Sequence, residues 1–186
     1  TRLDDASLRI AVALRLSAPV CASQQCVCGT EVDSSGVHGL SCRKSAGRHV
    51  RHNALNDLVK RALASAEIPS RLEPTSLSRS DGKRPDGLTI LPWKHGRCMV
   101  WNVTCPGTLA PSHLNHAVTG PGAVASFPEV NKRLTYEEIS RTHVFIPIAV
   151  ESMGAVGEDG LTFLKELGTR IMTVAKEPRS FEFLMQ

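Results

Sequence analysis

The feature that most constrains how this chain folds is a cluster of cysteine and histidine residues near its start. The cluster follows the pattern C-x-C-x9-H-x3-C, at Cys26, Cys28, His38 and Cys42. Three thiolates and one imidazole form a complete tetrahedral ligand set for Zn²⁺, and a site filled by four protein ligands is structural because it leaves no open position. The segment around the cluster is poor in apolar residues, so we expect bound metal to provide its folding free energy. Cys21 is a spare candidate ligand, and the alternative to a metal site is a loop of free thiols.

Basic residues are concentrated in one part of the chain. The whole sequence has 22 lysines and arginines against 18 acidic residues, a net charge of +4. Between Arg43 and Arg84 there are ten basic and four acidic residues, so this block alone carries a charge of +6. A basic block on an otherwise near-neutral chain is typical of a face that binds phosphates, although a solvated surface has the same composition.

Composition excludes several classes of protein. With 41% hydrophobic residues, the 186-residue chain can bury the core of one domain of ordinary size. It has only 5 Phe, 2 Trp and 1 Tyr, which argues against a nucleic-acid binder built on aromatic platforms. No stretch reaches the roughly 18 consecutive apolar residues of a membrane span, so we expect no membrane partner. The chain begins at Thr1, and we expect it to be a piece of a longer polypeptide.

The spacing of apolar residues predicts a mixed α/β sandwich. The predicted helices cover 6–18, 48–66, 111–118, 129–141 and 158–176, and the predicted strands cover 87–92, 97–104 and 143–150. Residues 68–85 contain three prolines and a glycine and are predicted to be a loop. We expect a helical linker over 1–20, a zinc knuckle over 21–46 and an α/β domain over 47–186.

An acidic residue opens the predicted hairpin. Asp86 follows Arg84-Pro85 at the end of the loop, and Asn102 lies in the second strand of the hairpin. Alternate side chains of a strand share a face, so Asn102 and Thr104 are predicted to point the same way. Metal-dependent nucleases place two carboxylates in this manner, one at the start of a strand and one in its partner, to hold Mg²⁺ against the scissile phosphate.

These motifs resemble those of a known family. The Pro-Asp dipeptide, the hairpin and the V-W-x-V-T strand are similar to the PD-(D/E)XK restriction-like nucleases. With CVCGTEVDSSGVHGLSC, GRHVRH, KRPDG, WNVTCP and FIPIAVE, the chain resembles the restriction-like endonuclease domain of site-specific non-LTR retrotransposon proteins. The resemblance implies a restriction-endonuclease-like core, with hairpin 87–104 and strand 143–150 in a mixed sheet flanked by helices, plus the zinc knuckle.

The resemblance also implies an activity. Such a domain follows a reverse transcriptase and nicks double-stranded target DNA, so that the new 3′ end primes reverse transcription. The expected cofactors are structural Zn²⁺ and catalytic Mg²⁺ or Mn²⁺. The expected partners are target DNA, the reverse transcriptase domain of the same polyprotein and element RNA, and the expected location is the nucleus.

Site residues follow from the same comparison. The resemblance implies that Asp86 and Asn102 hold the catalytic metal, while Lys132 and Tyr136 occupy the helix to which this family displaces its lysine. It also implies that the first core helix supplies polar residues to the site, for which His52 and Asn56 are the candidates. As charged residues beside a predicted groove, four basic side chains are candidate phosphate contacts. They are Arg48, Arg51, Lys83 and Arg84.

One departure from the family limits the predicted activity. The family has aspartate where this chain has Asn102, and asparagine keeps the shape and the carbonyl oxygen but loses the charge that binds Mg²⁺. Thr104 stands where the lysine of the motif usually falls. We therefore expect an inactive or severely impaired nuclease, in which Asn102 is either a deliberate substitution or the result of natural decay.

Two other functions stay open at this stage. One is a catalytically dead DNA- or RNA-binding module with the same fold and knuckle. The other is a purely structural zinc domain that contacts other parts of the same polypeptide. His113, His116 and Cys105 are predicted to be ordinary surface or packing residues rather than a second metal site, and Glu151 is either a supporting residue or exposed.

Overall fold

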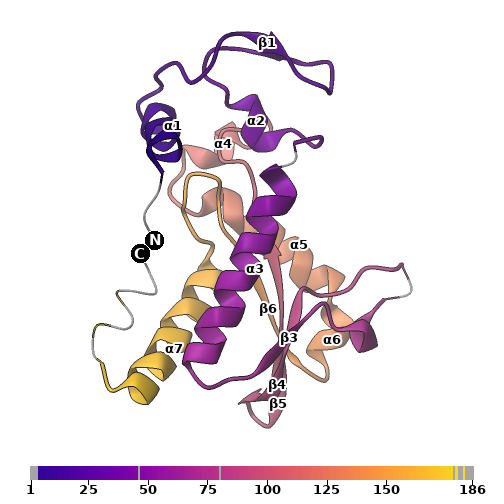
Figure 1. The fold of residues 1–186 in the computed structure, drawn as a ribbon. Helices are drawn as coiled ribbons and strands as arrows, with labels where there is room; N and C mark the ends of the chain where they lie inside the picture. Colours follow the sequence, from indigo (N-terminus) through magenta and orange to yellow (C-terminus); the bar gives the residue numbers. More distant parts are fainter. Residues whose placement is uncertain (1–3, 46, 80, 178, 180–181, 183–186) are drawn as a thin grey trace.

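A four-stranded mixed sheet forms the centre of the molecule (Figure 1). The computed structural model describes residues 4–45, 47–79, 81–177, 179 and 182. The strands lie in the order β3 (Ser70–Leu72), β4 (Gly87–Lys94), β5 (Arg97–Thr104) and β6 (Val144–Ala149). β3 pairs with β4 and β4 pairs with β5 in antiparallel fashion, whereas β6 runs parallel to β5. The predicted mixed sheet with helices on its faces is confirmed.

The β4–β5 hairpin turns through two residues. His95 and Gly96 both have positive φ, at 50° and 72°. A two-residue turn with positive φ at both positions matches the right-handed twist of the flanking strands. The hairpin therefore forms where the sequence predicts it, between 87–92 and 97–104.

Helices cover both faces of the sheet (Figure 1). On one face, α3 (Gly47–Ser65) and α7 (Glu158–Ala175) pack against alternate side chains of β5 and β6. This side holds the main apolar core, which includes Leu63, Trp101, Val103, Phe163 and Leu167. The other face is covered by α5 (Ala123–Thr135) and α6 (Glu137–Ser140). Because strand side chains alternate, Asn102 points toward this second face.

The predicted bounds of the helix between β5 and β6 are wrong. The helix predicted over 129–141 begins earlier, at Ala123, and is broken at Tyr136, so that α5 and α6 replace it. The start of α5 is stabilised by the carboxylate of Glu151, whose Oε1 accepts from the backbone N–H of Val124 at 3.1 Å and of Ala125 at 3.3 Å. A residue so far along the chain replaces the local capping residue from which a helix start is usually predicted.

The predicted loop 68–85 also contains regular structure. β3 pairs with β4, with Arg71 opposite Leu88, and a short 3-10 helix follows at Thr75–Leu77. Three residues are too few to show a strand periodicity, so this strand exists because β4 offers it an edge to pair with. The helix predicted over 111–118 is shorter than expected and is confined to α4 (Leu114–Ala117).

The cysteine-rich segment, residues 21–45, packs on the end of α3. It contains a two-stranded ribbon, β1 (Gln24–Gln25) with β2 (Glu31–Val32), and the short helix α2 (His38–Ser41). The guanidinium of Arg51 in α3 donates to the carbonyl of Leu40 at 2.7 Å. Ser41 lies close to the turn after β5, because a Cβ added to Gly107 in that turn would be 3.2 Å from the Cβ of Ser41. These contacts attach the segment to the α/β part.

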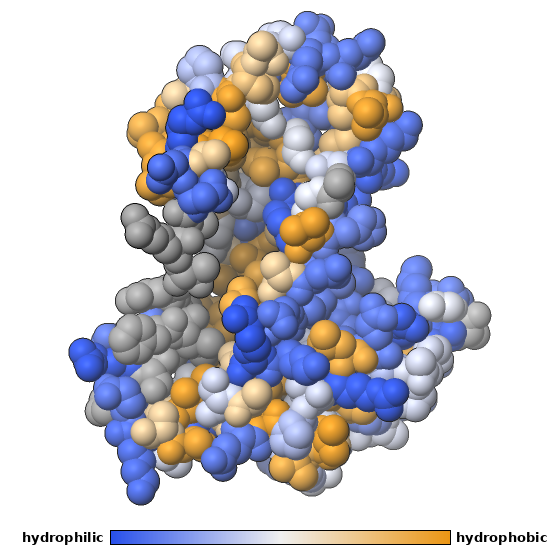
Figure 2. Space-filling model, in the orientation of Figure 1, coloured by the Kyte–Doolittle hydropathy of each residue, from blue (hydrophilic) through white to orange (hydrophobic). Residues whose placement is uncertain are grey.

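The first helix, α1 (Asp5–Arg15), buries none of its residues. Asp4 caps it by accepting from the backbone N–H of Ser7 at 2.9 Å. Figure 2 shows apolar side chains gathered over this helix, and its most exposed flank includes Leu8 and Val12. Within the described residues, no helix is long and apolar enough to cross a membrane. The outer ends of the predicted parts, at 1–3, 46 and 183–186, lie outside the described residues.

Replacing Gly87 by alanine is expected to lower the free energy of unfolding by about 1–3 kcal/mol, the usual cost of overpacking a core. A Cβ at this position would overlap the indole ring of Trp101, which is fully buried beneath α3. Urea denaturation measures the change. Gly39→Ala is the matched control, because its Cβ would meet nothing within 4 Å. A Gly87→Ala protein as stable as the Gly39→Ala protein would contradict this account of β4.

Candidate functional site

The four predicted zinc ligands come together. One ligand atom from each of Cys26, Cys28, His38 and Cys42 lies within 4.8 Å of all the others. The Sγ atoms of Cys26 and Cys42 are 3.7 Å apart, and Cys28 Sγ is 3.2 Å from His38 Nε2. This donor set can hold a metal ion and has the composition of a closed, structural zinc site.

Local contacts prepare one of these thiols to bind a cation. A hydrogen bond with the Thr30 hydroxyl, 3.3 Å from Cys28 Sγ, lowers the pKa of Cys28 to about 6. A thiolate is the form that binds metal. Cys21 lies outside the cluster, with its Sγ 3.5 Å from the carbonyl of Asp33. The spare candidate ligand is therefore not brought to the site.

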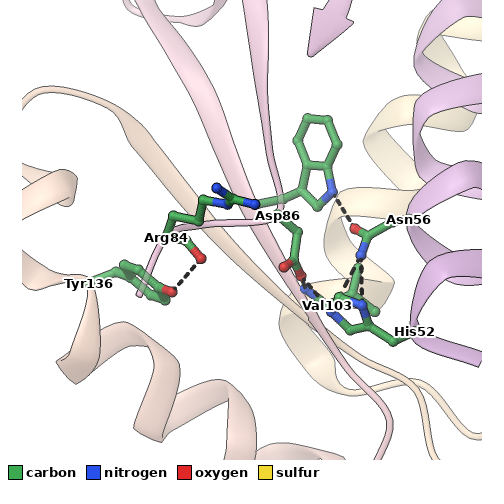
Figure 3. Close-up of polar contacts among 7 residues, drawn as sticks. His52, Asn56, Arg84, Asp86, Val103 and Tyr136 are labelled. Carbon is green, nitrogen blue, oxygen red and sulfur yellow. Dashed lines mark hydrogen bonds and ion pairs between the residues drawn. The ribbon is translucent and has the colours of Figure 1, made fainter. Parts of the chain in front are cut away.

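Asp86 lies directly before β4 and beside β5, with its carboxylate reaching toward His52 of α3 (Figure 3). Its Oδ2 accepts from the backbone N–H of Val103 at 2.6 Å and lies 3.1 Å from Nε2 of His52. The hydrogen bond to Asp86 raises the pKa of His52. The Asp86 carboxylate thus lies beside β5 at Val103, the residue after Asn102. When His52 is protonated, it is the cationic partner of this carboxylate.

Asn56 links this pair to the core. Its Oδ1 accepts from the indole N–H of Trp101 at 3.0 Å, and its Nδ2 lies 3.4 Å from the ring nitrogens of His52 (Figure 3). Trp101 is completely buried and cannot move easily. Asn56 therefore fixes the position of the His52 ring, and it lines the same pocket as His52 and Asp86.

Asn102 is buried, and its side-chain oxygen is unsatisfied. The residue is 4% exposed, and its Oδ1 has no hydrogen-bond partner among the described residues. A buried polar atom without a partner is rare in folded proteins and calls for an explanation, such as an ion or water that completes the site. The register of the hairpin, with Gly87 opposite Trp101, brings the Asp86 backbone beside Asn102.

Lys132 and Tyr136 approach from α5. Burial lowers the pKa of Lys132, and the charge of Asp86 opposes that effect. The Lys132 amine lies 5.9 Å from the centre of the Tyr136 ring. Burial raises the pKa of Tyr136, with the charge of Asp86 as the next cause. The Tyr136 hydroxyl donates to the carbonyl of Arg84 at 2.9 Å (Figure 3). Tyr136 therefore positions the segment that carries Asp86.

The four predicted phosphate contacts differ in the partners that they have within the chain. Arg48 is exposed and has no ion-pair partner in the described part of the chain, whereas Arg51 is bonded to the carbonyl of Leu40. Lys83 and Arg84 are exposed and form ion pairs, Lys83 with Asp81 at 3.4 Å and Arg84 with Glu73. The contact of Arg51 with Leu40 is internal, and a role of these four residues in DNA binding stays a prediction.

Two carboxylates are buried and structural: Glu129 was not singled out from the sequence, whereas Glu151 was expected to be either a supporting residue or exposed. Glu129 is 2% exposed and accepts from the backbone N–H groups of Ala149, Asp159 and Gly160. Glu151, at 4% exposed, holds the start of α5 and also accepts from the Thr108 hydroxyl at 3.1 Å. The sequence signal for a buried carboxylate is an acidic residue within an apolar stripe. Glu129 fits it, since it shares the buried side of α5 with Val124 and Ala125.

Comparison with known proteins gives no assignment. No protein-family model matches the chain. A search of curated proteins also found no match.

The contact between His52 and Asp86 is expected to stabilise the protein more at pH 5.5 than at pH 8.5. A raised pKa means that the folded state binds a proton more tightly than the unfolded state does. This stabilisation is fully present below the ordinary histidine pKa of about 6.5 and is lost as pH rises through the higher, folded-state value. Urea denaturation of the chain and of His52→Gln at both pH values gives the difference in unfolding free energy.

His49→Gln is the control for this experiment, because His49 is an exposed residue of the same helix. Both variants keep the Cys/His cluster, so effects of pH on the cluster cancel in the comparison. An equal cost of His52→Gln at the two pH values would show that the contact with Asp86 does not involve a proton.

Proposed function

We propose that this chain is a metal-dependent endonuclease domain of a non-LTR retrotransposon protein, with a restriction-endonuclease-like core, and that Asn102 impairs it. The observation that carries the proposal is the unpartnered, buried oxygen of Asn102 beside the strand position that binds the Asp86 carboxylate. The likeness of the RPD and VWNVT motifs to that family supports the same reading. Double-stranded target DNA is the proposed substrate.

The donor chemistry fits a hard divalent cation, since oxygen ligands are what Mg²⁺ and Mn²⁺ prefer. Asp86 and Asn102 would hold the ion, and when bound it would supply charge neutralisation at the phosphate and a more acidic attacking water. His52 holds one oxygen of Asp86 in place. Lys132, on which the charge of Asp86 acts, would stabilise the negative charge that develops on the phosphate.

The closed Cys/His cluster has a different role in this proposal. Zinc there would order the segment between α1 and α3 and hold it against α3 through Leu40 and Arg51. The reverse transcriptase domain of the same polyprotein and element RNA are proposed partners, and the nucleus is the proposed location.

A second function is a DNA-binding module without catalysis. The neutral amide of Asn102 favours it, because a carbonyl oxygen binds Mg²⁺ less strongly than a carboxylate does. In this case the chain would bind DNA and not cut it, whatever the metal.

Plasmid nicking with Mg²⁺ or Mn²⁺ separates the two functions. The chain and Asn102→Asp are assayed together on supercoiled DNA, with Asp86→Ala added to the second protein as a control. Nicking by Asn102→Asp that depends on Asp86 supports the nuclease. DNA binding by both proteins without nicking by either favours the binding module.

A further inference from the structure

A groove opens between the cysteine-rich segment and the end of β5. Its volume is about 400 Å³, which is within the range of about 300–1,000 Å³ seen for sites that bind small molecules and single nucleotides. The cysteine-rich segment contributes Ser41 and Arg43 to one wall, and α3 contributes Arg48. The floor is the turn that begins at Thr104, and α5 supplies the opposite wall through Phe127 and Asn131.

The walls of the groove combine positive charge with an exposed ring. Arg43 and Arg48 are exposed, neither forms an ion pair within the described residues, and no acidic side chain lines the groove. Phe127 is 49% exposed, the one exposed Phe, Trp or Tyr ring in the part of the chain that the structure describes. Its ring contacts His116, with centroids 4.2 Å apart, and this histidine does not line the groove. Guanidinium groups beside an aromatic face are the surface that single-stranded nucleic acids bind, through phosphates and a stacked base.

The groove lies next to the Asp86 site, and three elements, α3, α5 and β5, contribute residues to both. Arg48 precedes His52 by one turn of α3, and Pro128 precedes Lys132 by one turn of α5. In β5, Thr104 lies two residues beyond Asn102 on the same face. A helical turn rises about 5.4 Å and two strand residues about 6.6 Å. Because one nucleotide occupies about 3.4 Å along the axis of a duplex, the groove lies one or two nucleotides from the site.

We infer that this groove binds an unpaired nucleotide of the DNA strand whose phosphate lies at Asp86, with Arg43 and Arg48 on its phosphates and Phe127 against its base. The inference rests on the proposed function, since it takes the Asp86 site as the place of the scissile phosphate. A base inside a duplex has no free face for Phe127, so the strand must be unpaired or flipped at this point. The proposed substrate is therefore DNA with a locally opened strand.

The test measures DNA binding by fluorescence anisotropy without divalent cations, using zinc-loaded protein. Two labelled probes are compared, a blunt duplex and the same duplex with a single-stranded extension. Phe127→Ala is expected to weaken binding of the extended probe by about 5- to 100-fold, the usual contribution of one stacked base, and to change blunt-duplex binding less than about twofold. Val130→Ala is the control, an exposed apolar residue of α5 that does not line the groove.

The arginine contribution has its own readout. Arg48→Ala is expected to reduce the slope of log K against log salt concentration by about 1, as for the loss of one phosphate contact. Lys60→Ala removes an equal charge from an exposed position of α3 away from the groove, and it should leave the slope unchanged.

Several results would overturn the inference. It fails if Phe127→Ala binds the extended probe as the Val130→Ala protein does, or if it loses affinity for both probes alike. Tighter binding to the corresponding RNA extension would also reject DNA as the occupant. Nicking by Asn102→Asp is assayed separately, so a groove that fails this test leaves the nuclease proposal intact, whereas absent nicking with a clear Phe127 effect removes the nuclease alone.

Discussion

Asn102→Asp is expected to raise the rate of Mg²⁺-dependent plasmid nicking by at least about 100-fold, the scale on which one preorganised charge-stabilising group acts in an active site. The substitution keeps the shape of the side chain and adds the charge that a divalent cation requires. Asn102 is 4% exposed, so the new carboxylate would act in surroundings that screen it weakly. Nicking is measured as the conversion of supercoiled to relaxed plasmid.

The same substitution has a thermodynamic consequence that does not depend on catalysis. A buried carboxylate without a cation or a hydrogen-bond donor is costly, so Asn102→Asp is expected to melt at a lower temperature than the original chain in the absence of divalent cations. Mg²⁺ or Mn²⁺ that binds only the folded state should raise the melting temperature again, with a stabilisation that grows as the logarithm of the cation concentration once the site is saturated. The original chain should respond much less to the same additions.

Two controls separate a metal site from a general effect of charge. Asn115→Asp adds the same charge on an exposed residue of α4 and should show neither nicking nor a Mg²⁺-dependent shift. Asp86→Ala, added to Asn102→Asp, should remove both effects. If Asn102→Asp loses stability and Mg²⁺ does not restore it, the pair of residues does not form a cation site.

The elements that the sequence predicted correctly are those with a strong local pattern. α7 carries apolar residues at helical spacing, and the β4–β5 hairpin has two apolar runs around a two-residue turn. The start of α5 depends instead on Glu151, and β3 depends on the free edge of β4. Contacts of this kind join residues far apart in the chain, which a pattern of neighbouring residues does not record.

The candidate site divides in the same way. The Cys/His cluster was recognised because its four ligands follow a spacing that only their chemistry explains, and they do come together. Arg51 and Tyr136 were chosen from the sequence as candidate site residues. The structure adds their partners, since Arg51 donates to the backbone carbonyl of Leu40 and Tyr136 to that of Arg84. Asn102 was singled out by its position in a motif, whereas its unsatisfied oxygen is a property of the folded chain alone.

Removing zinc from the protein is expected to unfold the cysteine-rich segment and leave the α/β part folded. Structural zinc sites have apparent binding free energies of about 10–16 kcal/mol, far more than this small segment gains from its own packing. Of its described residues, only Val32 and Cys42 are buried. The core has separate support, because Leu63, Trp101, Phe163 and Leu167 lie between the sheet, α3 and α7.

Three signals distinguish these parts after a zinc chelator is added. Trypsin should cleave after Arg43 or Lys44 at least about tenfold faster, because local unfolding exposes the backbone there. The fluorescence of Trp93 and Trp101 should change little, since both side chains are buried in the α/β core, at 3% and 0% exposed. Circular dichroism should retain most of the helical signal, which comes mainly from α3, α5 and α7.

A pair of cysteine substitutions makes the same test without a chelator. Cys28→Ser removes a ligand and should reproduce the rapid cleavage by trypsin, whereas Cys21→Ser changes a thiol of the same segment that lies outside the cluster and should not. Zinc content, measured by atomic absorption, should fall in the first variant and stay unchanged in the second. Slow cleavage of Cys28→Ser, or zinc loss from Cys21→Ser, would show that the four-residue cluster is not what folds this segment.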